Sequence, residues 1–269
     1  MTDMDQPTQA PRPDRIELMG LAIDPVTERE AVARILAALS RGQGGWVVTA
    51  NLDQLRLLHR DPGLSWIFRS ADLVTVDGTT LLWASRLKGT PLPERVAGSD
   101  LVASLTAAAA EAGASLFLIG GNPGTAERAA EVLRLRYPGL RIAGVECPPF
   151  GFEEDPDWGP RLERALASAQ PDLVYVCLGF PKQERVIARL RAAAPQAWFL
   201  GLGISLSFVT GELRRAPPWM QRAGLEWMHR LAQEPRRLFD RFVVRGPPFA
   251  LALFAHAAAA RARSTWRRM

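Results

Sequence analysis

The chain has 269 residues, of which 48% are hydrophobic and 23% charged. This size is enough to bury a substantial core, and it predicts one globular α/β domain with an appendage. Two cysteines, Cys147 and Cys177, do not support a disulfide framework or a cysteine metal site, and Cys177 lies in an apolar run typical of a buried thiol. Residues 1–15 are polar and rich in proline, which is not the pattern of a signal peptide and predicts a disordered lead-in to a cytoplasmic protein.

Charge is distributed unevenly along the chain. Residues 214–269 contain 12 arginines and three acids, a net charge of +9, whereas the whole chain carries +5. The preceding 213 residues therefore carry a net charge of −4. A basic tail on a nearly neutral body predicts an anionic partner, either membrane phospholipid or nucleic acid.

Short apolar segments alternate with segments of helical length that are rich in Ala, Leu and Arg. This pattern predicts a Rossmann-like parallel sheet of about six strands flanked by helices. We expect strands at residues 46–50, 73–76, 115–119, 140–145, 173–178 and 198–202, and helices at 52–59, 79–87, 100–112, 124–137, 158–169 and 182–193. The catalytic domain is then predicted to span residues 16–213, with a basic helical appendage at 214–269.

Polar residues follow the first two predicted strands, where ligands bind in open parallel sheets. Asp77 would end a buried strand with its carboxylate at the cleft, where it could accept a proton from a sugar hydroxyl. The alternative is a turn former before Gly78. Thr49 and Asn51 could bind a sugar or a phosphate, but Asn51 could equally cap the following helix.

Two glycine-containing turns and one loop could hold phosphate groups. Gly120 and Gly121 begin a strand-to-helix turn whose N–H groups suit a pyrophosphate, although it is not the dinucleotide fingerprint and could be an ordinary tight turn. Lys182 and Gln183 begin a helix after Gly179. Lys182 could neutralise phosphate charge and Gln183 could read a hydroxyl or an amide, or both could be part of a solvated first turn. Arg95 could bind a diphosphate or be a surface charge.

A metal-binding pair of acids is not predicted. Asp155 and Asp157 follow two glutamates in a loop with no strand before it, which favours a solvated acidic turn. The three histidines are far apart in sequence and lack ligand spacing. We therefore expect a metal-independent protein without a cofactor.

The order of these signals resembles the WecG/TagA/CpsF glycosyltransferase family, known from bacterial surface polysaccharide, teichoic acid and exopolysaccharide synthesis. The resemblance runs from about Ile16 to Val243. The matching stretches are residues 49–51, 71–78, 94–100, 117–121, 179–184, 215–219, 224–231 and 234–237. One departure is that many relatives carry Phe-Asp where this chain has Leu206 and Ser207.

The resemblance implies an inverting, metal-independent transferase that uses a UDP-sugar and a polyprenyl-diphosphate-linked saccharide. It assigns the catalytic base to Asp77 and substrate binding to Thr49, Asn51, Arg95 and Gln183. We expect the Gly120–Gly121 turn, Arg95 and tail arginines, Arg215 among them, to stabilise the departing UDP. Two alternatives are a nucleotide-dependent oxidoreductase and a non-catalytic, membrane-associated assembly protein.

The basic tail is expected to hold the enzyme on the inner face of the cell membrane. The apolar run at residues 247–260 is shorter than the roughly 20 residues that span a bilayer, which favours a helix lying in the interface or capping the sheet. Membrane or acceptor contact is predicted for Arg230, Arg236, Arg237 and Arg241. A nucleic-acid partner is not expected. The sequence leaves the oligomeric state open, including a homo-oligomer.

Overall fold

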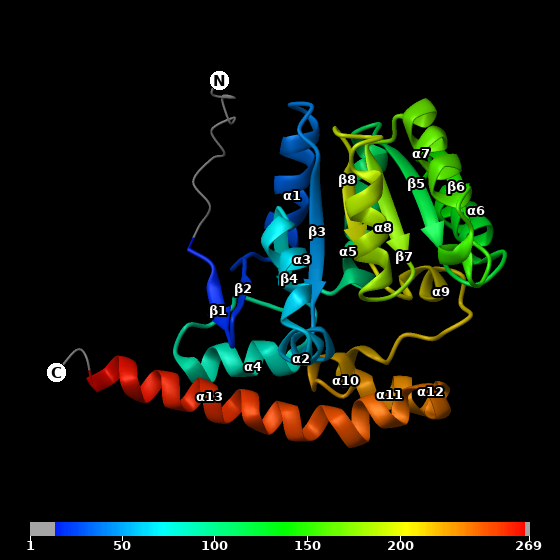
Figure 1. Ribbon diagram of the computed structural model, residues 1–269. Coiled ribbons are helices and arrows are strands. Elements are labelled where there is room, and N and C mark those ends of the chain that lie inside the picture. The colour runs from blue at the N-terminus through cyan, green and yellow to red at the C-terminus, as the bar shows by residue number, and fades with distance from the viewer. Residues whose placement is uncertain (1–13, 267–269) are drawn as a thin grey trace.

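The computed structural model describes residues 14–266, so the predicted lead-in lies almost wholly outside the described residues. The core of the fold is a six-stranded parallel sheet of order β4-β3-β8-β7-β5-β6 (Figure 1). Its strands are β3 (Gly45–Ala50), β4 (Leu73–Val76), β5 (Ser115–Gly120), β6 (Arg141–Glu146), β7 (Leu173–Cys177) and β8 (Trp198–Gly201). Each predicted strand is confirmed to within one residue at either end.

Helices cover both faces of the sheet because side chains of the buried strands alternate between two apolar layers. Val48 of β3 packs in one layer and Val47 in the other. The Val48 layer includes α2 (Leu52–Arg60), α3 (Ser65–Ser70), α7 (Trp158–Ala169) and α8 (Lys182–Leu190). The Val47 layer includes α1 (Glu28–Leu39), α5 (Gly98–Glu111), α6 (Thr125–Arg136) and α9 (Ser205–Val209).

The predicted set of elements omitted a short N-terminal hairpin and the helices α1, α3 and α9. The hairpin pairs β1 (Ile16–Leu18) with β2 (Leu21–Ile23) through Met19 and Gly20, both at positive φ as a two-residue hairpin turn requires. Helix α1 begins with a capping box in which Thr27 and Glu30 bond each other's backbone N–H groups. This Thr-x-x-Glu signal is visible in the sequence and could have revealed the helix.

The appendage packs across the carboxyl ends of the strands, next to α2 and α4 (Thr79–Lys88), as Figure 1 shows. It consists of α10 (Pro218–Arg222), α11 (Glu226–Gln233), α12 (Pro235–Phe239), the π-helical turn η3 (Asp240–Arg245) and α13 (Gly246–Trp266). Leu253 and Ala257 of α13 are buried in the apolar layer that also contains Leu81 and Ala84 of α4. The appendage is therefore joined to the catalytic body by a packed apolar contact.

The length of the last helix corrects one expectation from the sequence. A continuous helix of 30 residues, Pro235–Ser264, is long and apolar enough to cross a membrane by length and composition. The apolar run at residues 247–260 is therefore part of a longer helix, which continues from the π-helical turn η3 through Pro247 and Pro248 at the start of α13. One such helix is weak support for a membrane span, and α13 lies along α4 in the described structure.

Candidate active site

A cleft of about 690 Å³ lies between the carboxyl ends of the strands and the appendage. This volume is in the range of small-molecule sites. Its arginines are Arg56, Arg95, Arg230, Arg237 and Arg241, and its acids are Asp53, Asp77 and Glu226. The predicted residues Thr49, Asn51, Asp77, Arg95 and Gln183 line this one cleft together, as expected from their positions at strand ends.

Asp77 lies directly after β4, and its backbone N–H donates to the carbonyl of Ala50 at 2.7 Å. This bond fixes the end of β4 against β3. The carboxylate keeps 32% of its side-chain surface exposed, towards the cleft that it lines. Desolvation raises the pKa of Asp77 to about 6, while the nearby guanidinium of Arg95 opposes the rise. A carboxylate with this pKa is largely ionised at pH 7 and can take a proton.

Thr49 and Asn51 both make contacts within the protein. Thr49 Oγ1 donates to the carbonyl of Gly201 at 3.3 Å, which links the ends of β3 and β8. Asn51 Oδ1 accepts from the backbone N–H groups of Asp53 and Gln54 and caps α2, as the alternative interpretation proposed. A substrate contact by Asn51 would therefore involve its amide NH₂ group, because its oxygen serves the cap.

Gln183 is buried beneath the cleft and joins two loops that line it. Its Oε1 accepts from the backbone N–H groups of Gly179 and Gly203, at 3.2 and 2.9 Å. Its Nε2 donates to Glu184 Oε1 at 2.9 Å. Gly201 leaves room for this pair, since a Cβ there would come within 2.7 Å of Gln183 Nε2. Gln183 therefore holds two loops of the cleft in place, whether or not it also contacts substrate.

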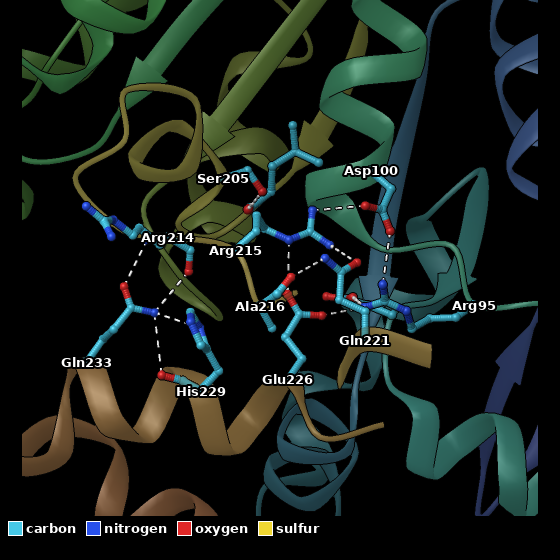
Figure 2. Close-up of polar contacts among 12 residues, drawn as sticks. Arg95, Asp100, Ser205, Arg214, Arg215, Ala216, Gln221, Glu226, His229 and Gln233 are labelled. Carbon is cyan, nitrogen blue, oxygen red and sulfur yellow. Dashed lines mark hydrogen bonds and ion pairs between the residues drawn. The ribbon is translucent and has the colours of Figure 1, made fainter. Parts of the chain in front are cut away.

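Arg95 and Arg215 share the same two carboxylates, Asp100 of α5 and Glu226 of α11 (Figure 2). Their four shortest contacts to these acids lie between 2.9 and 3.1 Å. Arg215 also donates to Gln221 Oε1 at 3.0 Å. This closed set of ion pairs ties the start of the appendage to the catalytic body. It also means that Arg95 already has anionic partners without a substrate.

The turn at Gly120 and Gly121 does not line the cleft. Both glycines have positive φ, and a Cβ at Gly120 would come within 2.5 Å of the carbonyl of Cys177, which explains the glycines without a ligand. The N-terminus of α6 already faces a carboxylate: Glu212 accepts from Thr125 at 2.6 Å and pairs with Arg128. A phosphate role for this turn stays a prediction.

Three of the four predicted tail arginines line the cleft, and Arg236 is exposed outside it. Arg230 pairs with Glu234 at 2.7 Å, and its guanidinium stacks on Phe208 at 5.3 Å from the ring centre. Arg237 also pairs with Glu234, at 2.9 Å. Arg241 pairs with Asp53 of α2 at 3.2 Å. The appendage therefore supplies most of the positive charge in the cleft.

Sequence reasoning missed the residues that hold the arginines in place. Asp100 and Glu226 lie within the quoted stretches 94–100 and 224–231, so the positions were visible but their pairing was not. Phe208, on which both Arg215 and Arg230 stack, is ordinary in sequence. The ion pairs of Arg95 with Glu226 and of Arg215 with Asp100 join residues more than 100 positions apart, which leaves no local pattern.

No group of three or more His, Cys, Asp or Glu side chains could hold a metal ion within the described part of the chain. The candidate acids Asp155 and Asp157 are exposed, and Asp155 Oδ1 accepts from the backbone N–H of Asp157 in a turn. Lys182 pairs with Glu153 and stacks on Phe152 rather than lining the cleft.

Comparison with known proteins places this fold and cleft in one family. The model of the glycosyl transferase WecG/TagA/CpsF family matches residues 16–263, so the chain belongs to this family and is a glycosyltransferase. It is 33% identical over 218 residues to an N-acetylglucosaminyldiphosphoundecaprenol N-acetyl-beta-D-mannosaminyltransferase of Bacillus spizizenii, covering 81% of this chain and 82% of the relative. A protein of the same name from Bacillus subtilis strain 168 is 33% identical over 171 residues, or 64% of each chain.

Proposed function

We propose that this glycosyltransferase moves an N-acetylhexosaminyl or hexosyl group from a UDP-sugar to a polyprenyl-diphosphate-linked saccharide, with inversion and without a metal ion. The names of both relatives describe an acceptor that carries N-acetylglucosamine on undecaprenyl diphosphate. This lipid-linked acceptor class supports our assignment, which would place the reaction at the inner face of a membrane. The particular sugar is left open, because specificity depends on cleft shape.

The observation that carries the proposal is the carboxylate of Asp77 in an arginine-lined cleft at the strand ends. Asp77 removes the proton from the acceptor hydroxyl as that oxygen attacks the anomeric carbon. The new C–O bond forms while the bond from the anomeric carbon to the UDP oxygen breaks. A single displacement of this kind inverts the anomeric carbon, and general-base catalysis contributes about 10²–10⁴-fold.

The departing UDP gains negative charge on its diphosphate, which the chain must stabilise. Arg230, Arg237 and Arg241 line the cleft and belong to the appendage. Guanidinium groups bind phosphate oxygens through paired hydrogen bonds, and a desolvated cleft strengthens that interaction. In this mechanism the arginines take the place of a divalent cation. We leave the Gly120–Gly121 turn out of this role because Glu212 occupies the N-terminus of α6.

The membrane-facing surface of the proposal is the outer side of the appendage. Its exposed apolar residues include Trp219, Phe239, Val244, Leu251 and Trp266. Only 11% of the most apolar 18-residue stretch of this 30-residue helix is buried inside the protein. The apolar side chains of the helix are therefore available to lipid. Because α13 also packs on α4, we propose that it lies in the interface rather than across the bilayer.

The test is a transfer assay with the full chain. The protein is incubated with a panel of UDP-sugars and a synthetic polyprenyl-diphosphate N-acetylglucosamine, and both UDP release and the glycosylated lipid are measured. We expect one UDP-sugar to give product, and NMR of the product to show the inverted anomeric configuration. Absence of product with every UDP-sugar would overturn the proposed donor and acceptor.

A further inference from the structure

The guanidinium of Arg95 lies among three carboxylates, at unequal distances from them. Its Nη1 is 3.0 Å from Glu226 Oε2 and 3.9 Å from Asp77 Oδ1. Its Nη2 is 3.1 Å from Asp100 Oδ2. The same nitrogen, Nη1, therefore faces both the proposed base and a carboxylate of the appendage, and it is closer to the appendage.

Arg215 fixes the position of Glu226. Its Nε lies 3.0 Å from Glu226 Oε1, so the two oxygens of Glu226 each have an arginine partner. Its Nη1 lies 2.9 Å from Asp100 Oδ1, which closes the ring of ion pairs seen in Figure 2. A carboxylate held from both sides in this way has little freedom to release Arg95.

We propose that Glu226 is a positioning residue for the reaction: it holds Arg95 away from Asp77, so that the carboxylate of Asp77 stays free to take a proton. This role rests on the proposed function, in which Asp77 is the base. Because Glu226 belongs to α11, the base is fully competent only while the appendage is docked on the catalytic body. Glu226 thus links docking of the appendage to proton transfer in the cleft.

The charges around Asp77 all support this direction. Arg95 and Arg215 lower the pKa of Asp77, whereas Glu226 and Asp100 raise it. Without Glu226, one negative charge is lost and Arg95 Nη1 is released to close on Asp77. Both changes stabilise the ionised carboxylate, and an opposite charge in contact lowers a carboxyl pKa by about 1–3 units. A weaker base accepts the acceptor proton less readily.

The pKa of Asp77 can be measured directly by carboxyl ¹³C NMR, with Asp77→Asn used to assign the signal. We expect a value near 6 in the wild type and a value lower by about one pH unit in Glu226→Gln. The matched control is Glu234→Gln, which removes an acid from the end of the same helix, and it should leave the pKa of Asp77 within about 0.3 of the wild type. An unchanged pKa in Glu226→Gln overturns the proposal.

Undocking of the appendage could also lower this pKa by admitting water, so the test needs a background without Arg95. In Arg95→Gln, the further change Glu226→Gln should lower the pKa of Asp77 by less than half as much as it does when Arg95 is present. Equal lowering in both backgrounds would assign Glu226 a purely structural role and overturn the proposal. Glu226→Asp, which keeps the charge, should recover a pKa closer to the wild type.

The pH profile of transfer then separates this inference from the proposed function. In Glu226→Gln we expect the acidic limb of kcat/KM to move down with the pKa of Asp77 and the plateau rate to fall several-fold. If the NMR shift occurs but the wild type transfers no sugar, the proposed function fails and the Glu226 contact stands. If the wild type transfers sugar and the acidic limb does not move in Glu226→Gln, the role of Glu226 fails.

Discussion

The hydroxyl of Thr125 donates to the carboxylate of Glu212 at 2.6 Å, at the first residue of α6. The second carboxylate oxygen accepts from Ser207 at 3.1 Å. The N-terminus of a helix favours an anion because its N–H groups are unpaired and its dipole is positive there. Here the chain supplies that anion itself, from the segment that follows α9.

We predict that Glu212→Ala lowers the free energy of unfolding by about 1–2 kcal/mol, because charged hydrogen bonds to Thr125 and Arg128 are lost. The KM for the donor should stay within about two-fold of the wild type, since the turn at Gly120 does not line the cleft. Chemical denaturation and donor titration measure the two effects, with Glu212→Gln as the control that keeps an acceptor for Thr125. A donor KM that falls several-fold would mean that Glu212 competes with donor phosphate at this turn.

Asp77→Asn should lower kcat by about 10²–10⁴-fold, because the amide keeps the shape of the side chain but cannot take a proton. UDP affinity, measured by calorimetry, should change less than two-fold. In the wild type the base must be ionised, so kcat/KM should fall about ten-fold per pH unit below a pKa of about 6 and level off above it. Transfer by Asp77→Asn within a few-fold of the wild type would remove Asp77 from the mechanism.

The strands and the residues after them could be predicted from sequence because each is a local pattern. An apolar run followed by Asp77-Gly78 predicts a strand end whatever the rest of the chain does. The parallel sheet then brings Thr49, Asp77 and Gln183 to one edge. The sequence pattern could not show which groups each of these side chains bonds in the folded protein. Gln183, for example, bonds the backbone N–H groups of Gly179 and Gly203.

The ion-pair ring was also beyond prediction. It depends on the docking of α11, which brings Glu226 to Arg95 across 131 positions of the chain. Helix α13 illustrates the same limit in another way. The apolar run at residues 247–260 is too short by itself to span a bilayer, but the helix that contains it extends over Pro235–Ser264.

Glu184 provides a test of the buried pair beneath the cleft. It is fully buried, and its Oε2 has no hydrogen-bond partner among the described residues. Burial raises the pKa of Glu184 to about 7 from 4.5. The folded state therefore binds a proton more tightly than the unfolded state, and this contribution to stability is complete below about pH 4.5 and lost as the pH rises through about 7.

Glu184→Gln keeps an acceptor for Gln183 Nε2 but needs no proton. We predict that it raises the melting temperature relative to the wild type at pH 8, and that the difference shrinks at pH 5. Thermal denaturation at both pH values measures this, with the exposed Glu111→Gln as the control. A difference between Glu184→Gln and the wild type that is the same at both pH values would contradict a buried, titrating carboxyl.

Chelation should leave transfer intact. The cleft contains five arginines against three acids, so its lining can offset diphosphate charge without a cation. We predict that EDTA changes the rate less than two-fold and that added Mg²⁺ or Mn²⁺ gives no further increase. Loss of turnover on chelation, restored by either ion, would require a metal site and would direct mutagenesis to Asp155 and Asp157.

The membrane role of the appendage needs a test that leaves the fold intact. Truncation after Ala223 would remove Leu253 and Ala257 from the core, so it would destabilise the body as well as the tail. Leu251 and Trp266 are better targets because they are 70% and 82% exposed. The control is Leu135→Ser, 84% exposed on α6, a helix at the β6 edge of the sheet away from α13 (Figure 1).

We predict that the double variant Leu251→Ser, Trp266→Ser weakens binding to vesicles containing 30% phosphatidylglycerol by about ten-fold or more, since each fully buried large apolar side chain is worth about 1.5–3 kcal/mol. Raised salt should weaken the binding of the wild type to these vesicles, because each basic residue near anionic lipid contributes about 1 kcal/mol and salt screens this attraction. Transfer to a vesicle-embedded acceptor should fall in parallel, while transfer to a soluble short-chain acceptor stays near the wild-type rate. Leu135→Ser should behave as the wild type in both assays. Equal vesicle binding by the double variant and the control would mean that α13 does not contact the membrane through this face.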